Sequence, residues 1–202
     1  MFPWRQTNDP FKILVSELFL RKTARKQVSR LYEQFFSMYP TFEALHKADT
    51  KSIEMVIRPL GMEHIRAVAL KEIAEVILSA HDGSVPCQRE QLLGLPHIGP
   101  YITNAVLCFA FGKDAPLLDT NVVRVTSRIF SLRSKKKRVR EDPEMWEAVQ
   151  VMIPKGEGRD FNLAILDFAF SICTAKNPKC SICPMLNICE YEKKACPRSR
   201  VH

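Results

Sequence analysis

Four cysteines close to the end of the chain constrain its fold more than any other feature. They follow the spacing C-x6-C-x2-C-x5-C within seventeen positions. The four are Cys173, Cys180, Cys183 and Cys189. Pro178 and Pro184 interrupt helical geometry in this segment, so four thiolates can converge on one centre. Such a set of sulfurs suits a tetrahedral zinc ion, an iron–sulfur cluster or two disulfides.

The rest of the chain favours one of these alternatives. Disulfides fit least, because the first residues lack the charged-then-apolar order of an export signal. Zinc motifs generally pair two short knuckles across a longer spacer, whereas this segment has one close pair flanked by loops of six and five residues. The spacing therefore favours an iron–sulfur cluster. Of the other cysteines, Cys87 and Cys108 are expected to be packing residues and Cys196 a free thiol.

The charge balance indicates a polyanionic partner. The chain has 30 Lys and Arg residues against 22 Asp and Glu, a formal net charge of +8, which suits phosphate binding through counterion release. Nowhere do 18 consecutive apolar residues occur, so we expect no membrane span. With 202 residues, 46% of them hydrophobic, the chain can form one domain or two intimate ones.

Apolar spacing predicts an all-α protein, since no segment shows sustained alternation with a period of two. The Asp9-Pro10 pair starts a long helix, or two in succession, that ends near Ser37. Further helices are expected over residues 42–48, 51–57, 63–80, 120–130 and 160–173, and from Asp142-Pro143 onward.

A helical hairpin is predicted over residues 89–111. Its turn, Leu95-Pro96-His97-Ile98-Gly99, can present backbone N–H groups to a phosphate. Further along, Asp119 stands between apolar residues where a helix begins. It can serve as an N-cap, and a carboxylate there can also stabilise the positively charged sugar that forms when a glycosidic bond breaks.

Taken together, these residues resemble the helix-hairpin-helix DNA glycosylase superfamily, which includes endonuclease III and the adenine and thymine mismatch glycosylases. The motifs appear in the family's order over nearly the whole chain. They are Phe2-Pro3-Trp4-Arg5, Asp9-Pro10-Phe11, Ser16-Glu17-Leu18, Leu20-Arg21-Lys22-Thr23, the hairpin, Asp119, Phe161-Asn162 and the cysteine spacing.

The resemblance implies an architecture and a cofactor. A six-helix barrel domain would span residues 7–113, and an iron–sulfur cluster domain would span residues 114–202 together with 1–6. Double-stranded DNA would lie in the cleft between them. The four cysteines of the C-terminal segment would hold a [4Fe–4S] cluster.

The resemblance also implies a mechanism. Asp119 matches the family's essential aspartate, and Glu17 matches the glutamate that mismatch glycosylases place in the base pocket, where it would activate water or bind the base edge. Tyr101 stands where endonuclease III-like enzymes have a Schiff-base lysine. Without an amine there, covalent attack and strand cleavage have no nucleophile, so a monofunctional enzyme is implied, with Tyr101 against the extruded base.

Among family members, the chain is most similar to the archaeal-type G/T mismatch glycosylases. Adenine glycosylases usually carry Leu-Gln-Gln-Thr after the glutamate and a further C-terminal domain, whereas this chain has Leu20-Arg21-Lys22-Thr23 and stops soon after its cysteines. The implied substrate is therefore thymine or uracil opposite guanine. Arg21 and Met62 would fill the gap left by the flipped nucleotide.

The hairpin and a basic run bear on how DNA would be held. His97 replaces the first glycine of the usual Leu-Pro-Gly-x-Gly turn, which can alter the turn or bring an imidazole near a phosphate, while contact through Gly99 is less affected. The run from Arg133 to Arg140 holds six basic residues in eight. It can follow a DNA backbone, or be a solvated loop. Four more basic residues would extend it, namely Lys193, Lys194, Arg198 and Arg200.

Two alternative functions stay open. One is removal of adenine opposite guanine or oxidised guanine, and the other is a DNA-binding module that performs no chemistry. In each case we expect a monomer in the cytoplasm, associated with the nucleoid.

Overall fold

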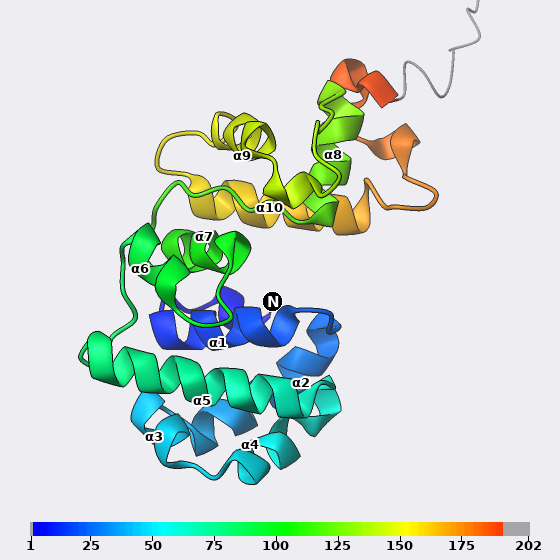
Figure 1. The fold of residues 1–202 in the computed structure, drawn as a ribbon. Helices are drawn as coiled ribbons and strands as arrows, with labels where there is room; N and C mark the ends of the chain where they lie inside the picture. Colours follow the sequence, from blue (N-terminus) through cyan, green and yellow to red (C-terminus); the bar gives the residue numbers. More distant parts are fainter. Residues whose placement is uncertain (1, 192–202) are drawn as a thin grey trace, which may run out of the picture. The chain divides into compact units, whose positions relative to one another are not determined.

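The structure, a computed structural model, describes residues 2–191 and consists there of helices and turns, with no strand in that range. The all-α expectation is therefore confirmed. The chain divides into two compact units, residues 1–113 and residues 114–202. Each unit has its own set of packed helices (Figure 1).

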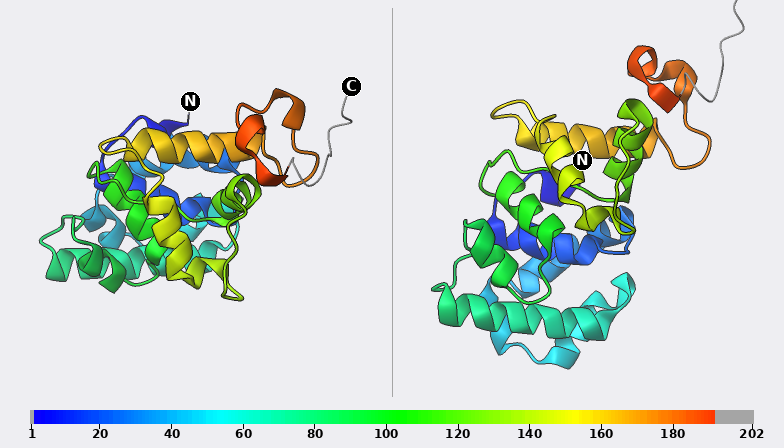
Figure 2. Two further views of the ribbon diagram at one scale, coloured as in Figure 1. Left: turned by 90° about the horizontal axis from the view of Figure 1, so that it is seen from above. Right: turned by 45° about the horizontal axis from the view of Figure 1, so that its top comes forward.

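The first unit is built around the long helix α5. Its helices are α1 (Pro10–Leu20), α2 (Arg25–Met38), α3 (Phe42–Lys47), α4 (Thr50–Ile57), α5 (Glu63–Ala80), α6 (Arg89–Gly94) and α7 (Pro100–Phe109). Helices α3 and α4 pack along one side of α5, and α1 lies between α5 and α7 (Figures 1 and 2). The helix α1 is consequently buried along most of its length, from Phe11 to Phe19.

Local sequence explains where the first helices begin and end. The Asp9 carboxylate accepts the N–H of Phe11 at 2.9 Å, and Pro10 occupies the first turn, where a missing N–H costs nothing. The chain then forms two helices in succession instead of one long helix. They are separated by a turn in which Lys22 has φ +57.

Aromatic packing fills the interior of the first unit. The Phe19 and Phe35 rings meet edge to face with centroids 4.8 Å apart, and Phe11 meets Phe42 in the same way at 4.7 Å, the geometry that aromatic pairs prefer. The 3-10 helix η1 (Pro3–Arg5) contacts α1 of this unit, although the resemblance groups residues 1–6 with the second domain.

The second unit is built on two helices that pack against each other, α8 (Thr120–Phe130) and α10 (Gly158–Ser171). Shorter elements surround them: η3 (Val139–Glu141), α9 (Pro143–Gln150), η4 (Cys180–Ile182) and η5 (Leu186–Ile188). A small apolar core joins α8 and α10 to the cysteine segment. Its members are Val125, Ile129, Ala169, Cys173 and Cys189.

No helix within residues 2–191 combines the length and apolar character needed to cross a bilayer. Several residues singled out in the sequence lie outside the described residues. They are Cys196, Lys193, Lys194, Arg198 and Arg200.

Candidate active site and cluster loop

The predicted hairpin is formed by α6 and α7, joined by the turn that contains His97 and Gly99. His97 occupies the left-handed region with φ +62, a conformation that glycine adopts without steric cost. Its Nε2 lies 2.6 Å from Glu72 Oε2 on α5, so this substitution for glycine adds an ion pair or hydrogen bond to the turn. Gly99 is the N-cap residue of α7.

Two further predicted DNA contacts, Arg21 and Met62, also lie in the first unit. Arg21, directly after α1, donates from Nη1 to the backbone oxygen of His97 at 3.4 Å. Met62, directly before α5, has φ +54 and is 40% exposed. The structure thus brings Arg21 and His97 together, and it holds Met62 at a sharply turned helix start where its side chain reaches solvent.

Glu17 and Tyr101 lie on two helices that pack against each other, α1 and α7. Glu17 is buried within α1. Tyr101 is the second residue of α7 and is partly buried. Beside Glu17, the hydroxyl oxygen of Ser16 is buried with no hydrogen-bond partner among the described residues, and the same is true of Thr103 on α7. Helices α1 and α7 therefore each carry a buried hydroxyl group close in sequence to a predicted site residue.

In the second unit, Asp119 is the N-cap residue of α8, as the sequence predicts. Its Oδ1 accepts the N–H groups of Asn121 and Val122, both at 2.8 Å, and its Oδ2 accepts the side-chain amide of Asn121 at 2.7 Å. A carboxylate at a helix N-terminus is also stabilised by the helix dipole. Because a carboxylate offers about four acceptor positions, these three bonds leave capacity on Oδ2. The residue is half-buried, so the group is not sealed in a core.

Asn121, which orients Asp119, is itself held by Arg124. Arg124, one turn further along α8, donates from Nη1 to Asn121 Oδ1 at 2.9 Å. The same guanidinium donates to the backbone oxygens of Cys173 at 3.0 Å and of Ala169 at 2.9 Å. The sequence did not single out Asn121 or Arg124, and the role of Arg124 depends on residues 169 and 173 lying alongside α8.

The chain leading into Asp119 is fixed by one buried amide. Asn162 on α10 accepts the N–H of Leu117 at 3.0 Å and donates to the backbone oxygens of Ala115 and Gly158, both at 2.8 Å. Asp114 accepts the N–H groups of Gly156 and Gly158 at 2.8 and 3.0 Å. These bonds pin residues 114–118 to the start of α10, directly before the capping aspartate.

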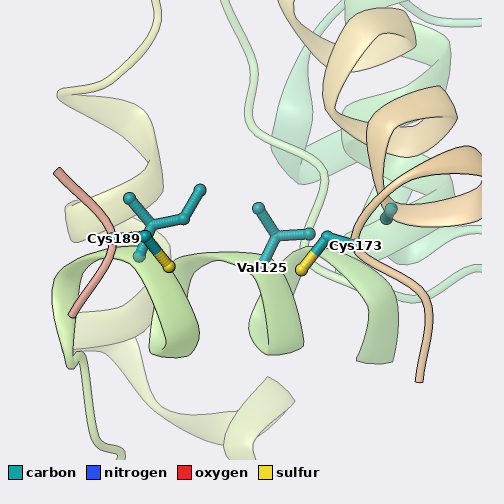
Figure 3. Packing of buried hydrophobic residues seen from close by; sticks show 5 residues of the cluster. Val125, Cys173 and Cys189 are labelled. Carbon is teal, nitrogen blue, oxygen red and sulfur yellow. The ribbon is translucent and has the colours of Figure 1, made fainter. Parts of the chain in front are cut away.

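The cysteine segment wraps around the far part of α8. The thiols of Cys173 and Cys189 both lie over that helix, on either side of Val125 in the view of Figure 3. Cys180 begins η4 and Cys183 follows it. No disulfide joins any two of the six cysteines among the described residues. In that range no three His, Cys, Asp or Glu side chains are gathered as a single metal ion requires.

One of these thiols lies beside a cation. Arg128 Nη1 lies 3.6 Å from Cys173 Sγ and donates to the Thr174 backbone oxygen at 2.7 Å, and the guanidinium stands 4.8 Å from the centroid of the Tyr191 ring. Four cysteines in one short segment are a donor set that fits an iron–sulfur cluster.

The basic run is a surface loop with partners of its own. Lys135 Nζ lies 2.8 Å from Glu144 Oε1, and Arg138 Nη1 lies 3.1 Å from Glu141 Oε1. The Asp142 carboxylate accepts from the Ser134 hydroxyl at 2.5 Å, and this hydrogen bond is the main reason that the pKa of Asp142 is lowered. The loop is therefore partly neutralised and ordered by its own acidic residues.

A helical hairpin followed by a helix that starts at an aspartate, and then by a four-cysteine loop, defines a class of helical DNA repair proteins. Comparison with known proteins identifies the family within that class. Residues 15–150 match the family described as HhH-GPD superfamily base excision DNA repair protein, and residues 173–189 match the iron–sulfur binding domain of endonuclease III. The chain belongs to the HhH-GPD superfamily and is a DNA glycosylase with an endonuclease III-type [4Fe–4S] binding motif.

Individual relatives match this chain over nearly its whole length. A thymine/uracil-DNA glycosylase of Pyrobaculum aerophilum is 43% identical over 95% of this chain and 85% of its own length. A thymine-DNA glycosylase of Aeropyrum pernix is 44% identical over 94% and 86%. The solved structure of a thermostable thymine-DNA glycosylase superposes with a TM-score of 0.92 at 40% identity, covering 96% of this chain and 89% of that one.

Proposed function

We propose that this protein is a monofunctional glycosylase that hydrolyses the N-glycosidic bond of thymine or uracil opposite guanine in double-stranded DNA. It would act as a monomer on nucleoid DNA in the cytoplasm and leave an abasic site. The observation that carries the chemistry is the Asp119 carboxylate, held by three hydrogen-bond donors at the start of α8. The choice of base is supported by the relatives, two of which are named for thymine or uracil at 43% and 44% identity.

Asp119 would act on the sugar. As the base departs, positive charge develops at C1′ and on the ring oxygen, and a fixed carboxylate stabilises that charge without having to reorganise. The donors from Asn121 and Val122 keep the group in place. The free acceptor capacity of Oδ2 would face the reacting carbon and the attacking water.

Glu17 and Tyr101 would act on the departing base and on the attacking water. Glu17 is buried on α1, where it would take a proton from water or, when protonated, bind the base edge. Tyr101 has a phenol at the position of the Schiff-base lysine in endonuclease III-like enzymes. A phenol cannot form an imine with the opened sugar, so the reaction would end at the abasic site.

Arg21, Met62, His97 and Gly99 would hold the DNA. The exposed side chain of Met62 would enter the gap that a flipped nucleotide leaves in the base stack, and Arg21 would help to fill the same gap. The turn at His97 and Gly99 would bind the phosphate backbone. A mismatched base is also easier to extrude than a paired one, which adds to selectivity.

Cys173, Cys180, Cys183 and Cys189 would hold the [4Fe–4S] cluster. When bound, the cluster would crosslink residues 173–189 into one rigid loop beside α8. Hydrolysis of a glycosidic bond transfers no electrons, so the chain's own side chains supply each step of the reaction.

A panel of mismatched duplexes tests the proposal. Duplexes with G·T, G·U, A·G and A opposite oxidised guanine are incubated with the enzyme, each strand carrying its own label, and split into samples with and without alkali. We expect the thymine or uracil strand to break only after alkali. Breakage of the adenine strand would favour adenine removal, breakage without alkali would contradict the role given to Tyr101, and intact strands throughout would favour a binding module.

A further inference from the structure

The first unit contains a buried cation that the proposed chemistry does not use. Arg66, on the first turn of α5, is 5% exposed. Its Nη1 donates to the Phe19 backbone oxygen at 2.8 Å, and its Nη2 donates to the Arg21 backbone oxygen at 2.7 Å and to Thr23 Oγ1 at 2.6 Å. All three acceptors are neutral groups.

Burial of this guanidinium would be energetically unfavourable if Arg66 only filled space in the core. Burial of a cation is unfavourable unless it is hydrogen-bonded, and here burial, together with the charge of Arg21, lowers the pKa of Arg66. The guanidinium Nε has no partner among the described residues. The cation instead binds backbone carbonyl oxygens at the end of α1, which have no hydrogen-bond partner within the helix. The short, charge-assisted bonds fix the turn that contains Lys22 at φ +57.

From this turn, hydrogen bonds lead to two other segments. Thr23 Oγ1, which accepts from Arg66, donates to the Leu60 backbone oxygen at 3.1 Å, and Gln27 Nε2 donates to the Pro59 backbone oxygen at 3.2 Å. Arg21 reaches the His97 backbone oxygen. The side chains of Thr23 and Arg21 therefore join the turn after α1 to the 58–62 segment and to the hairpin turn, and Arg66 holds both residues in that turn.

We propose that Arg66 is a positioning residue that sets the spacing of these three segments, and thereby the efficiency with which a nucleotide is extruded from DNA. The inference rests on the proposed function, because Arg21, Met62 and His97 are there the DNA contacts. Arg66 does not touch the reacting atoms. Its effect should therefore appear in extrusion of the nucleotide and not in cleavage of the glycosidic bond.

The test varies the cost of extrusion. Single-turnover rates of base removal are measured on G·T, on G·U and on uracil opposite an abasic site, a series in which the target base becomes easier to flip. Arg66→Lys keeps the charge, but a single ammonium lacks the planar fork that serves three acceptors. We expect this variant to be slower by about tenfold or more on G·T and by less than about threefold on uracil opposite an abasic site.

Two further variants separate positioning from loss of stability. Thr23→Val removes the hydroxyl that links Arg66 to Leu60, and it should give a weaker form of the same substrate-dependent loss, whereas Thr23→Ser should restore the rate. Lys71→Met is the matched control, because Lys71 is another α5 cation that binds backbone oxygens, those of His46 and Ala48, away from the three segments. It should lower all rates equally or not at all.

The outcomes are distinguishable. If the wild-type enzyme removes no pyrimidine from any duplex, the proposed function fails before Arg66 is considered. If the wild type is active but Arg66→Lys and Thr23→Val lose the same factor on all three duplexes, or lose nothing, the positioning role is overturned. A fluorescent base analogue beside the mismatch gives an independent readout, since Arg66→Lys should reduce the unstacking signal that accompanies extrusion.

Discussion

Asp119 combines a structural task with the chemical task proposed above. It caps the start of α8 through Oδ1 and keeps acceptor capacity on Oδ2, which the proposed mechanism directs at the sugar. The sequence predicted the cap, because an aspartate before an apolar helix is a common N-cap, and the chemical task stays a prediction. The role of Arg124, which holds Asn121, could not be predicted, since its other partners, Ala169 and Cys173, are distant in sequence.

Substitutions at Asp119 should separate the two tasks. Asparagine is as good an N-cap as aspartate, whereas alanine removes the cap and costs about 1 kcal/mol of unfolding free energy. We therefore expect Asp119→Asn to unfold in urea like the wild type and to lose base removal by orders of magnitude. Asp119→Ala should lose both. An active Asp119→Asn enzyme in single-turnover assays would remove Asp119 from the mechanism.

His97 has a strained backbone conformation, and glycine at this position would remove the strain. A side chain at φ +62 costs about 1–2 kcal/mol relative to glycine, and the exposed contact with Glu72 returns little of it. We expect His97→Gly to be more stable than His97→Ala by about 1 kcal/mol, because both lose the imidazole and only alanine keeps the Cβ. Urea denaturation at neutral pH measures the difference, and equal midpoints would contradict it.

At the scale of helices, local signals were sufficient for most boundaries. Asp9-Pro10 and Asp142-Pro143 begin α1 and α9, and the predicted 63–80 helix is α5. The break between α1 and α2 was left open because residues 21–27 contain no proline or glycine to mark the end of a helix. What separates those helices is the turn held by Arg66, a contact made across 45 residues to Arg21. Sequence periodicity contains no trace of such a contact.

Asn162 illustrates the same limit at the start of α10. Replacing it with alanine leaves the buried Leu117 N–H and Ala115 oxygen without partners, and each such group costs about 1–3 kcal/mol. We expect Asn162→Ala to lower the free energy of unfolding by about 2–4 kcal/mol and to slow base removal, because residues 115–118 lead directly into Asp119. Denaturation and single-turnover rates measure the two effects. As a control, Gln150→Ala removes an exposed bond to the Asp114 oxygen in the same unit and should cost much less.

At the scale of the whole molecule, the order of motifs carried more information than any single motif. The hairpin, Asp119 and the cysteine spacing together predicted the family, which the comparisons confirm. The sequence alone left the base open between pyrimidine and adenine. Sequence also could not show that two of the four cysteines belong to the core between α8 and α10, since that core forms only when the segment folds back.

Loss of one ligand should release the cluster without unfolding the chain. Cys180 lies outside the small core that contains Cys173 and Cys189, so we expect Cys180→Ala to abolish the brown colour and visible absorbance of the purified protein while retaining most of its helical circular dichroism. Binding to duplex DNA should weaken with it. Cys87→Ala, at an exposed free thiol in the first unit, is the control and should keep its colour. A coloured Cys180→Ala protein would remove this residue from the ligand set.

Gly99 lies in the hairpin turn, to which the proposed function assigns the DNA backbone. Its φ of −110 is open to any amino acid, and a methyl group built there meets no atom within 4 Å among the described residues. Folding therefore does not demand glycine at this position. Under the proposed function, alanine here would leave thermal resistance unchanged but weaken DNA binding, because its methyl group would take the space of a backbone phosphate.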